Sequence, residues 1–278
     1  MVANRERLEL LARLGYAARG VVSLIIGALA LLAAIGRGGG ATDSKGALQT
    51  ILSQPLGTAL LAVVALGVFG FALWRTFQAI LDADGRGTGP KAIAARAGQA
   101  VSAIIYASLG VFAVSLLLGG RQGDGGGTST EDWTAWLLVR PFGRWLVGAA
   151  GLAVSGSALA MGYKAWTASF RRYLTCDAGA ARWVVPLGRA GYAARSVVFL
   201  IVGGFLVVAA YQADPSEARG LGGALLALQA QPFGRALFTL VALGLTAFGA
   251  FELAESRYRR INAPDAREVV AAAKPMVM

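Results

Sequence analysis

A few polar side chains interrupt long apolar stretches of this sequence. Tyr16 and Arg19 are three residues apart, and the same pair recurs as Tyr192 and Arg195. A spacing of three places both side chains on one face of a helix. Arginine binds phosphate or carboxylate groups through two parallel hydrogen bonds, and a tyrosine hydroxyl can donate another. Such a face is suited to holding an anion.

Other charged residues occur at matching depth in later apolar stretches. They are Arg75, Lys164, Glu252 and Glu255. One interpretation is a belt that binds an anionic lipid or a small anionic ligand, with the two glutamates as internal ion-pair partners. The belt would consist of Tyr16, Arg19, Arg75, Lys164, Tyr192 and Arg195. The alternative is purely structural: the cations extend to the headgroups or pair internally, for example Arg19 with Glu252.

The composition places these residues in a membrane protein. Of the 278 residues, 56% belong to the hydrophobic class and 15% are charged, whereas a soluble domain carries roughly 25% charged residues. About 20 apolar residues cross the hydrocarbon core as a helix. Six stretches qualify, at Leu14–Ile35, Leu56–Leu81, Ala97–Leu118, Phe142–Trp166, Leu187–Tyr211 and Phe233–Leu253. The predicted fold class is therefore an all-α membrane protein with six transmembrane helices.

The basic residues predict the orientation. Sixteen of the 26 Lys and Arg residues fall on the side that holds both termini, and seven fall on the other side. Because cytoplasmic loops are enriched in Lys and Arg, both termini are predicted to be cytoplasmic. The formal net charge of +11 does not indicate nucleic-acid binding, since the basic residues flank apolar stretches.

Two short motifs recur three times in the same order. The first reads R-L-G-Y-A-A-R-G-V-V from Arg13, R-A-G-Q-A-V-S from Arg96 and R-A-G-Y-A-A-R-S-V-V from Arg189. The second is Q-P-L-G, R-P-F-G and Q-P-F-G, starting at Gln54, Arg140 and Gln231. Its proline is predicted to be the first residue of each even-numbered spanning helix, a position that needs no N–H partner.

These motifs divide the chain into three repeats of two helices. The repeats are 1–82, 83–175 and 176–262, followed by a cytoplasmic tail, 263–278. A two-helix unit returns to the side it left, so all three copies have the same orientation. Parallel repeats of this kind predict a pseudo-threefold axis along the membrane normal.

The same motifs carry a family resemblance over nearly the whole chain. They are G-Y-A-A-R-G-V-V at Gly15, its copy at Gly191, the repeated P-F-G, Y-K-A-W-T-A-S-F-R-R-Y-L at Tyr163 and E-S-R-Y-R-R-I at Glu255. The chain resembles bacterial integral membrane proteins with tandem copies of the domain of unknown function 1206. The resemblance implies the fold and a place in the bacterial cytoplasmic (inner) membrane, and it supplies no catalytic residues. The middle copy departs from the pattern at Gln99 and Ser102.

Enzyme chemistry is not expected. The chain has no histidine and a single cysteine, Cys176, which excludes most zinc sites and histidine-based acid–base catalysis. We therefore expect no catalytic residue, metal or cofactor. Three functions remain: a non-enzymatic protein whose belt binds anionic lipid or ligand, an accessory subunit of a larger membrane complex with another membrane protein as partner, and a small-solute or ion transporter or channel.

Overall fold

The computed structural model describes residues 2–37, 39–82, 87, 89–120 and 130–260, and the predicted tail lies outside them. The described residues form α-helices and two short 3-10 helices, without a strand. The α-helices are α1 (Val2–Ala34), α2 (Ser44–Leu52), α3 (Gly57–Ile80), α4 (Pro90–Leu117), α5 (Thr130–Leu138), α6 (Gly143–Thr167), α7 (Ala178–Gln212), α8 (Leu221–Gln229) and α9 (Gly234–Tyr258). Six of them, α1, α3, α4, α6, α7 and α9, are long and apolar enough to cross a membrane. This confirms the all-α, multi-pass prediction.

Several helices extend beyond their apolar stretches. Helix α4 begins at Pro90 rather than near Ala97, and α9 continues to Tyr258. Helix α7 begins at Ala178, where the Asp177 carboxylate accepts a hydrogen bond from the Ala180 N–H at 3.0 Å. The helix then continues through Pro186. An apolar stretch marks only the part of a helix that lies in hydrocarbon, so polar turns at its ends escape the prediction.

The second sequence motif forms the same turn in all three copies. The glycine N–H donates to the carbonyl three residues earlier, at 2.8, 2.9 and 2.7 Å in the first, second and third copy. The residue between proline and glycine is left-handed each time: the φ angles are 59° at Leu56, 62° at Phe142 and 59° at Phe233. The predicted helix start was therefore wrong. Each helix begins at the glycine, because proline occupies the second position of a turn that must first be completed.

Glycine is required at the end of this turn. A Cβ on Gly143 would collide with the carbonyl oxygen of Leu137, in the last turn of the preceding short helix. Gly57 and Gly234 approach the carbonyl groups of Leu52 and Gln229 in the same way. The motif thus joins each short helix to the following spanning helix without room for a side chain.

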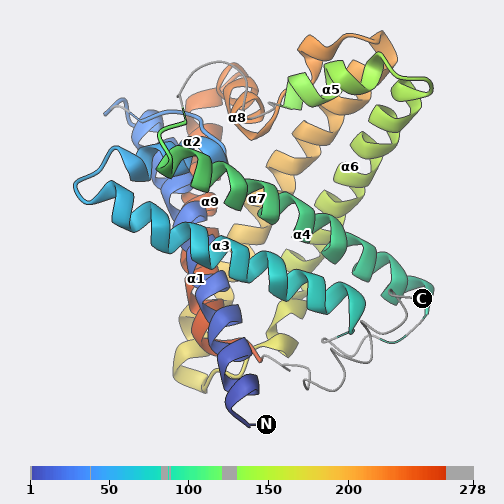
Figure 1. The fold of residues 1–278 in the computed structure, drawn as a ribbon. Coiled ribbons are helices and arrows are strands. Elements are labelled where there is room, and N and C mark those ends of the chain that lie inside the picture. The colour runs from blue at the N-terminus through green and yellow to red at the C-terminus, as the bar shows by residue number, and fades with distance from the viewer. Residues whose placement is uncertain (1, 38, 83–86, 88, 121–129, 261–278) are drawn as a thin grey trace, which may run out of the picture. The chain divides into compact units, whose positions relative to one another are not determined.

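The chain forms two compact units. Of the described residues, the first comprises 2–19, 48–82, 87, 89–120 and 252–260. Its helices α3 and α4 run side by side (Figure 1), and Ala12, Tyr16, Phe71 and Trp74 form a buried cluster.

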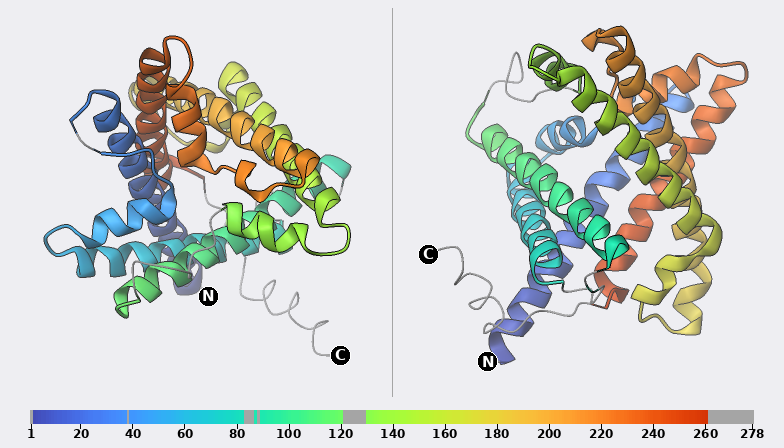
Figure 2. Two further views of the ribbon diagram at one scale, coloured as in Figure 1. Left: turned by 90° about the horizontal axis from the view of Figure 1, so that it is seen from above. Right: turned by 90° about the vertical axis from the view of Figure 1, so that its right-hand side faces the viewer.

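Of the described residues, the second unit comprises 20–37, 39–47 and 130–251. Its helices α6 and α7 form an extensively packed pair, visible in both views of Figure 2. The buried core includes Val198, Leu225, Phe238 and Ala242. The units do not follow the repeat boundaries, since α4 belongs to the first unit and α6, from the same repeat, belongs to the second.

Two glycine substitutions should differ in their effect on stability. We expect Gly143→Ala to lower the free energy of unfolding by about 1–3 kcal/mol, because the new methyl group must displace backbone. Gly204→Ala should be neutral or stabilising by about 0.5–1 kcal/mol, since its Cβ meets nothing within 4 Å and alanine favours the helix. Thermal unfolding in detergent measures both. Equal midpoints for the two variants would contradict the role given to the turn.

Candidate functional site

An aromatic side chain lies at the centre of the polar residues of the first unit. The Arg19 and Arg75 guanidinium carbons lie 5.1 and 4.9 Å from the ring centroid of Phe71. The Tyr16 ring meets Phe71 edge-on at 5.1 Å. We call this set, with the residues paired to it, the Phe71 cluster. Its members are Tyr16, Arg19, Phe71, Trp74, Arg75, Gln78, Tyr106, Glu252, Glu255 and Arg259.

A buried ion pair joins α1 to α9 within this cluster. The Arg19 guanidinium contacts the Glu252 carboxylate, and the two side chains are 11% and 0% exposed. This is the pair that the structural interpretation offered as an example. Taking both charges out of water is costly, so removing either partner would leave an uncompensated charge in the protein interior.

The other charged residues of the cluster are also paired. Arg259 donates to Glu255 at 2.7 Å, and its guanidinium carbon lies 4.9 Å from the Tyr16 ring centroid. Arg75 donates to the Gln78 side chain at 3.2 Å. The cluster thus holds three arginines and two glutamates, which leaves one excess positive charge. No group of three or more metal-ligating side chains occurs in the described part of the chain.

Apart from the Arg19–Glu252 ion pair, three buried donor atoms of the cluster have no hydrogen-bond partner among the described residues. They are the Tyr16 hydroxyl, the Trp74 Nε1 and the Arg75 Nε. Buried polar atoms almost always bond to protein or ordered water. The indole and guanidinium groups only donate, so any molecule that pairs with them, ordered water or ligand, must accept hydrogen bonds.

The equivalent residues of the third repeat lie in the second unit. The Arg195 guanidinium carbon lies 4.7 Å from the ring centroid of Phe248 and 4.9 Å from that of Phe199. The Lys164 ammonium lies 5.8 Å from the Tyr192 ring centroid. The structure therefore distributes the predicted belt over both units, with Lys164, Tyr192 and Arg195 in the second and the remaining belt residues and glutamates in the first.

The structure also assigns a role to the arginine that opens the first motif. Arg13 donates to the carbonyl groups of Ser256 and Arg257 at 3.0 and 2.6 Å, at the end of α9. Arg96 does the same for Ala79 and Ile80 of α3, at 2.7 and 2.8 Å. Arg189 does so for Ala165 and Trp166 of α6, at 3.0 and 3.1 Å. Each arginine therefore caps the last turn of a neighbouring helix.

Sequence reasoning missed these caps and part of the cluster. The signal for the caps was present, because the arginine occurs in all three copies, whereas the tyrosine three residues later occurs in only two. Phe71 aligns with Phe248, which has the same ring contact to an arginine. Arg259, which directly follows α9, was missed because the sequence analysis counted it only among the basic residues that flank the last span.

Comparison with known proteins agrees with this architecture. The sequence profile of the Domain of Unknown Function family DUF1206 matches residues 14–82, 97–168 and 190–259. An uncharacterized protein of Bacillus subtilis (strain 168), YxxB, is 36% identical over 253 residues, which cover 90% of each chain. No solved structure matches the chain.

A double-mutant cycle should detect the buried ion pair. We expect Glu252→Gln to lower the free energy of unfolding by about 3–5 kcal/mol, because it leaves the Arg19 charge uncompensated. Combining Arg19→Met with Glu252→Leu should recover most of this loss. Unfolding in detergent is the measurement.

The matched control is Glu9→Gln. Glu9 pairs with Arg13 at 2.7 Å, but the Glu9 and Arg13 side chains are 42% and 34% exposed, so loss of this pair should cost less than about 1 kcal/mol. Additive effects of the Arg19 and Glu252 substitutions would contradict the pairing.

Proposed function

The chain belongs to the Domain of Unknown Function 1206 family, and we propose that it is a non-enzymatic membrane protein whose Phe71 cluster binds an anionic group. The observation that carries this proposal is the set of three buried donors, the Tyr16 hydroxyl, Trp74 Nε1 and Arg75 Nε, without an acceptor in the described residues. A phosphate or carboxylate group accepts from several donors at once. The cluster's excess positive charge favours such a ligand over a neutral one.

The depth of the cluster favours a lipid phosphate. Arg75 lies five residues before the end of α3, which corresponds to roughly 8 Å along the helix. Basic pockets between helices near the cytoplasmic surface suit the headgroups of anionic lipids. A soluble anion has the same chemistry, so the two sources must be separated by experiment.

The proposed location is the cytoplasmic membrane, with both termini in the cytoplasm. The excess of Lys and Arg on the terminal side supports this orientation. The three arginine caps support a pseudo-threefold arrangement, because each repeat supplies a cap to the repeat before it and the first repeat supplies one to the last.

Removing one hydroxyl should test the anion site without disturbing the ion pair. Native mass spectrometry of gently extracted protein should show a retained phosphate-containing molecule, and Tyr16→Phe should lower its occupancy. A hydrogen bond to a charged group contributes enough for a roughly ten- to hundredfold loss of affinity. Tyr106→Phe is the matched control, because the Tyr106 ring contacts Phe71 at 4.7 Å and its hydroxyl is not one of the three donors.

A second measurement, thermal unfolding with added lipid or phosphate, identifies the source of the anion. Thermal stabilisation by phosphatidylglycerol, but not by inorganic phosphate, assigns the site to a lipid headgroup, and the reverse assigns it to a soluble anion. Unchanged occupancy in Tyr16→Phe assigns the donors to water and rejects the proposal. A stoichiometric protein in the same spectrum would favour the accessory-subunit function instead.

The single cysteine can report the orientation without further engineering. Cys176 lies between η1 (Ser169–Tyr173) and α7 and is partly exposed. A membrane-impermeant maleimide should label it in inverted vesicles and not in intact spheroplasts. The control variant, Cys176→Ser combined with Ser216→Cys in the opposite loop, should show the reverse. Labelling of Cys176 in spheroplasts would contradict the proposed orientation.

A further inference from the structure

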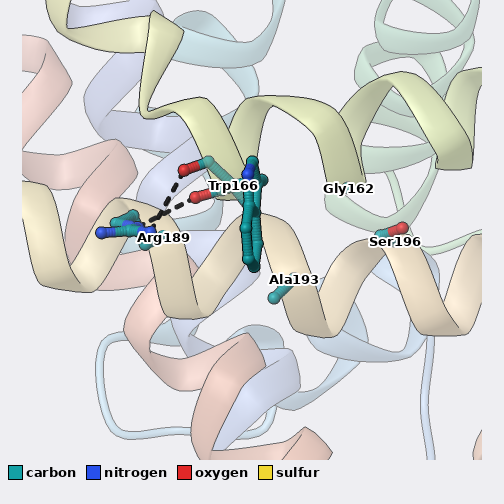
Figure 3. A pocket seen from close by; sticks show the side chains of 6 residues that line it. Gly162, Trp166, Arg189, Ala193 and Ser196 are labelled. Atoms are coloured by element: carbon teal, nitrogen blue, oxygen red, sulfur yellow. Dashed lines mark hydrogen bonds between the residues drawn. The ribbon is translucent and has the colours of Figure 1, made fainter.

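A groove of about 390 Å³ lies between α6 and α7, near the end of α6 (Figure 3). Its lining residues are Gly162, Ala165 and Trp166 from α6 and Arg189, Ala193 and Ser196 from α7. From Arg189 to Ser196 the groove follows α7 for seven residues, or about 10 Å.

The floor of the groove is small and apolar. Gly162 has no side chain, and Ala193 is exposed. The Ser196 hydroxyl donates to the carbonyl group of Ala158 at 2.7 Å, so its donor is satisfied within the protein. The end of the groove at Gly162 and Ser196 therefore favours a hydrocarbon group.

The other end is aromatic and cationic. The Trp166 indole extends from α6 towards Ala193, and Arg189 lies on the far side of the indole from Ser196 (Figure 3). Trp166 is 81% exposed, as is typical of a tryptophan at the membrane interface. Arg189 uses Nε and Nη2 for its two carbonyl bonds, so Nη1 can donate to a ligand.

The groove depends on residues specific to this pair of helices. By the repeat alignment, the positions of Gly162 and Trp166 hold Thr76 and Ile80 in α3, and Leu253 and Arg257 in α9. The other repeats thus fill the floor with a larger side chain and lack the indole wall.

We propose that this groove binds one phospholipid, with an acyl chain beside Gly162 and Ala193 and the phosphate near Arg189. The gradient from apolar floor to guanidinium matches the amphiphilic shape of a phospholipid. Arg182, also exposed and two turns earlier on the same face of α7, adds positive charge beyond the phosphate position. The site lies in the second unit and shares no residue with the Phe71 cluster, so it goes beyond the proposed function.

Filling the groove should remove this lipid. Phosphatidylglycerol is titrated into delipidated protein in detergent and counted by native mass spectrometry. We expect Ala193→Leu to hold one phosphatidylglycerol fewer than wild type at the same concentration, with affinity for that lipid lowered at least about tenfold. Trp166→Ala, at another exposed position, should weaken the same binding event.

The control is Ala100→Leu, which makes the same exposed substitution at the equivalent position of α4 and should bind as wild type. Repeating the titration in a Tyr16→Phe background separates this site from the Phe71 cluster. Equal lipid counts in Ala193→Leu, Ala100→Leu and wild type would reduce the groove to ordinary lipid contact and overturn the proposal. Diacylglycerol binding as tightly as phosphatidylglycerol would overturn the role of Arg189.

Discussion

The end of a spanning helix leaves carbonyl groups without backbone partners, and this structure satisfies them with arginine. Arg13, Arg96 and Arg189 each donate two hydrogen bonds to the last turn of another helix. Arg144 does the same at the opposite end of α7, where it donates to Ala210 and Tyr211 at 2.7 and 2.6 Å. Because each cap is charge-assisted and joins two helices, it helps to hold that pair of helices in register.

The three repeats share this frame but differ in the polar groups it holds. In the first repeat, Arg19 contacts both Phe71 and the Glu252 carboxylate. In the third repeat, Arg195 contacts Phe248, and the position that holds Glu252 in α9 holds Met161 in α6. The aromatic contact is therefore shared by the first and third repeats, whereas the carboxylate is specific to one pair of helices. A buried charge pair adds little net stability compared with apolar packing, so the frame alone does not account for its presence.

Hydropathy and repetition were sufficient to predict six spans, three two-helix copies and the positions of the charged residues along them. They could not show which helices pack together, because all six spans are apolar and hydropathy does not indicate which span contacts which. The predicted belt illustrates the limit. Its residues are predicted to lie at the same depth in the membrane, yet the structure places Arg19 and Arg195 in different units. The P-F-G turn illustrates another. Its left-handed Phe142 and Phe233 cannot be anticipated from side-chain preference, since that conformation is unfavourable for phenylalanine.

Comparison of the copies separates structural from functional residues within a single chain. A residue that occurs in all three copies and makes the same contact in each, such as the capping arginine or the turn glycine, is explained by the frame. Glu252, Gly162 and Trp166 occur in one copy each and are not needed to build a repeat. Glu252 brings a charge into the protein interior at a cost, and Gly162 lets α6 lie close to α7, since a Cβ there would meet the Ser196 hydroxyl at 3.0 Å. Both features lie beside groups that we propose contact a ligand, the arginines of the Phe71 cluster and Arg189, and we therefore propose that the function of the protein lies where its repeats differ.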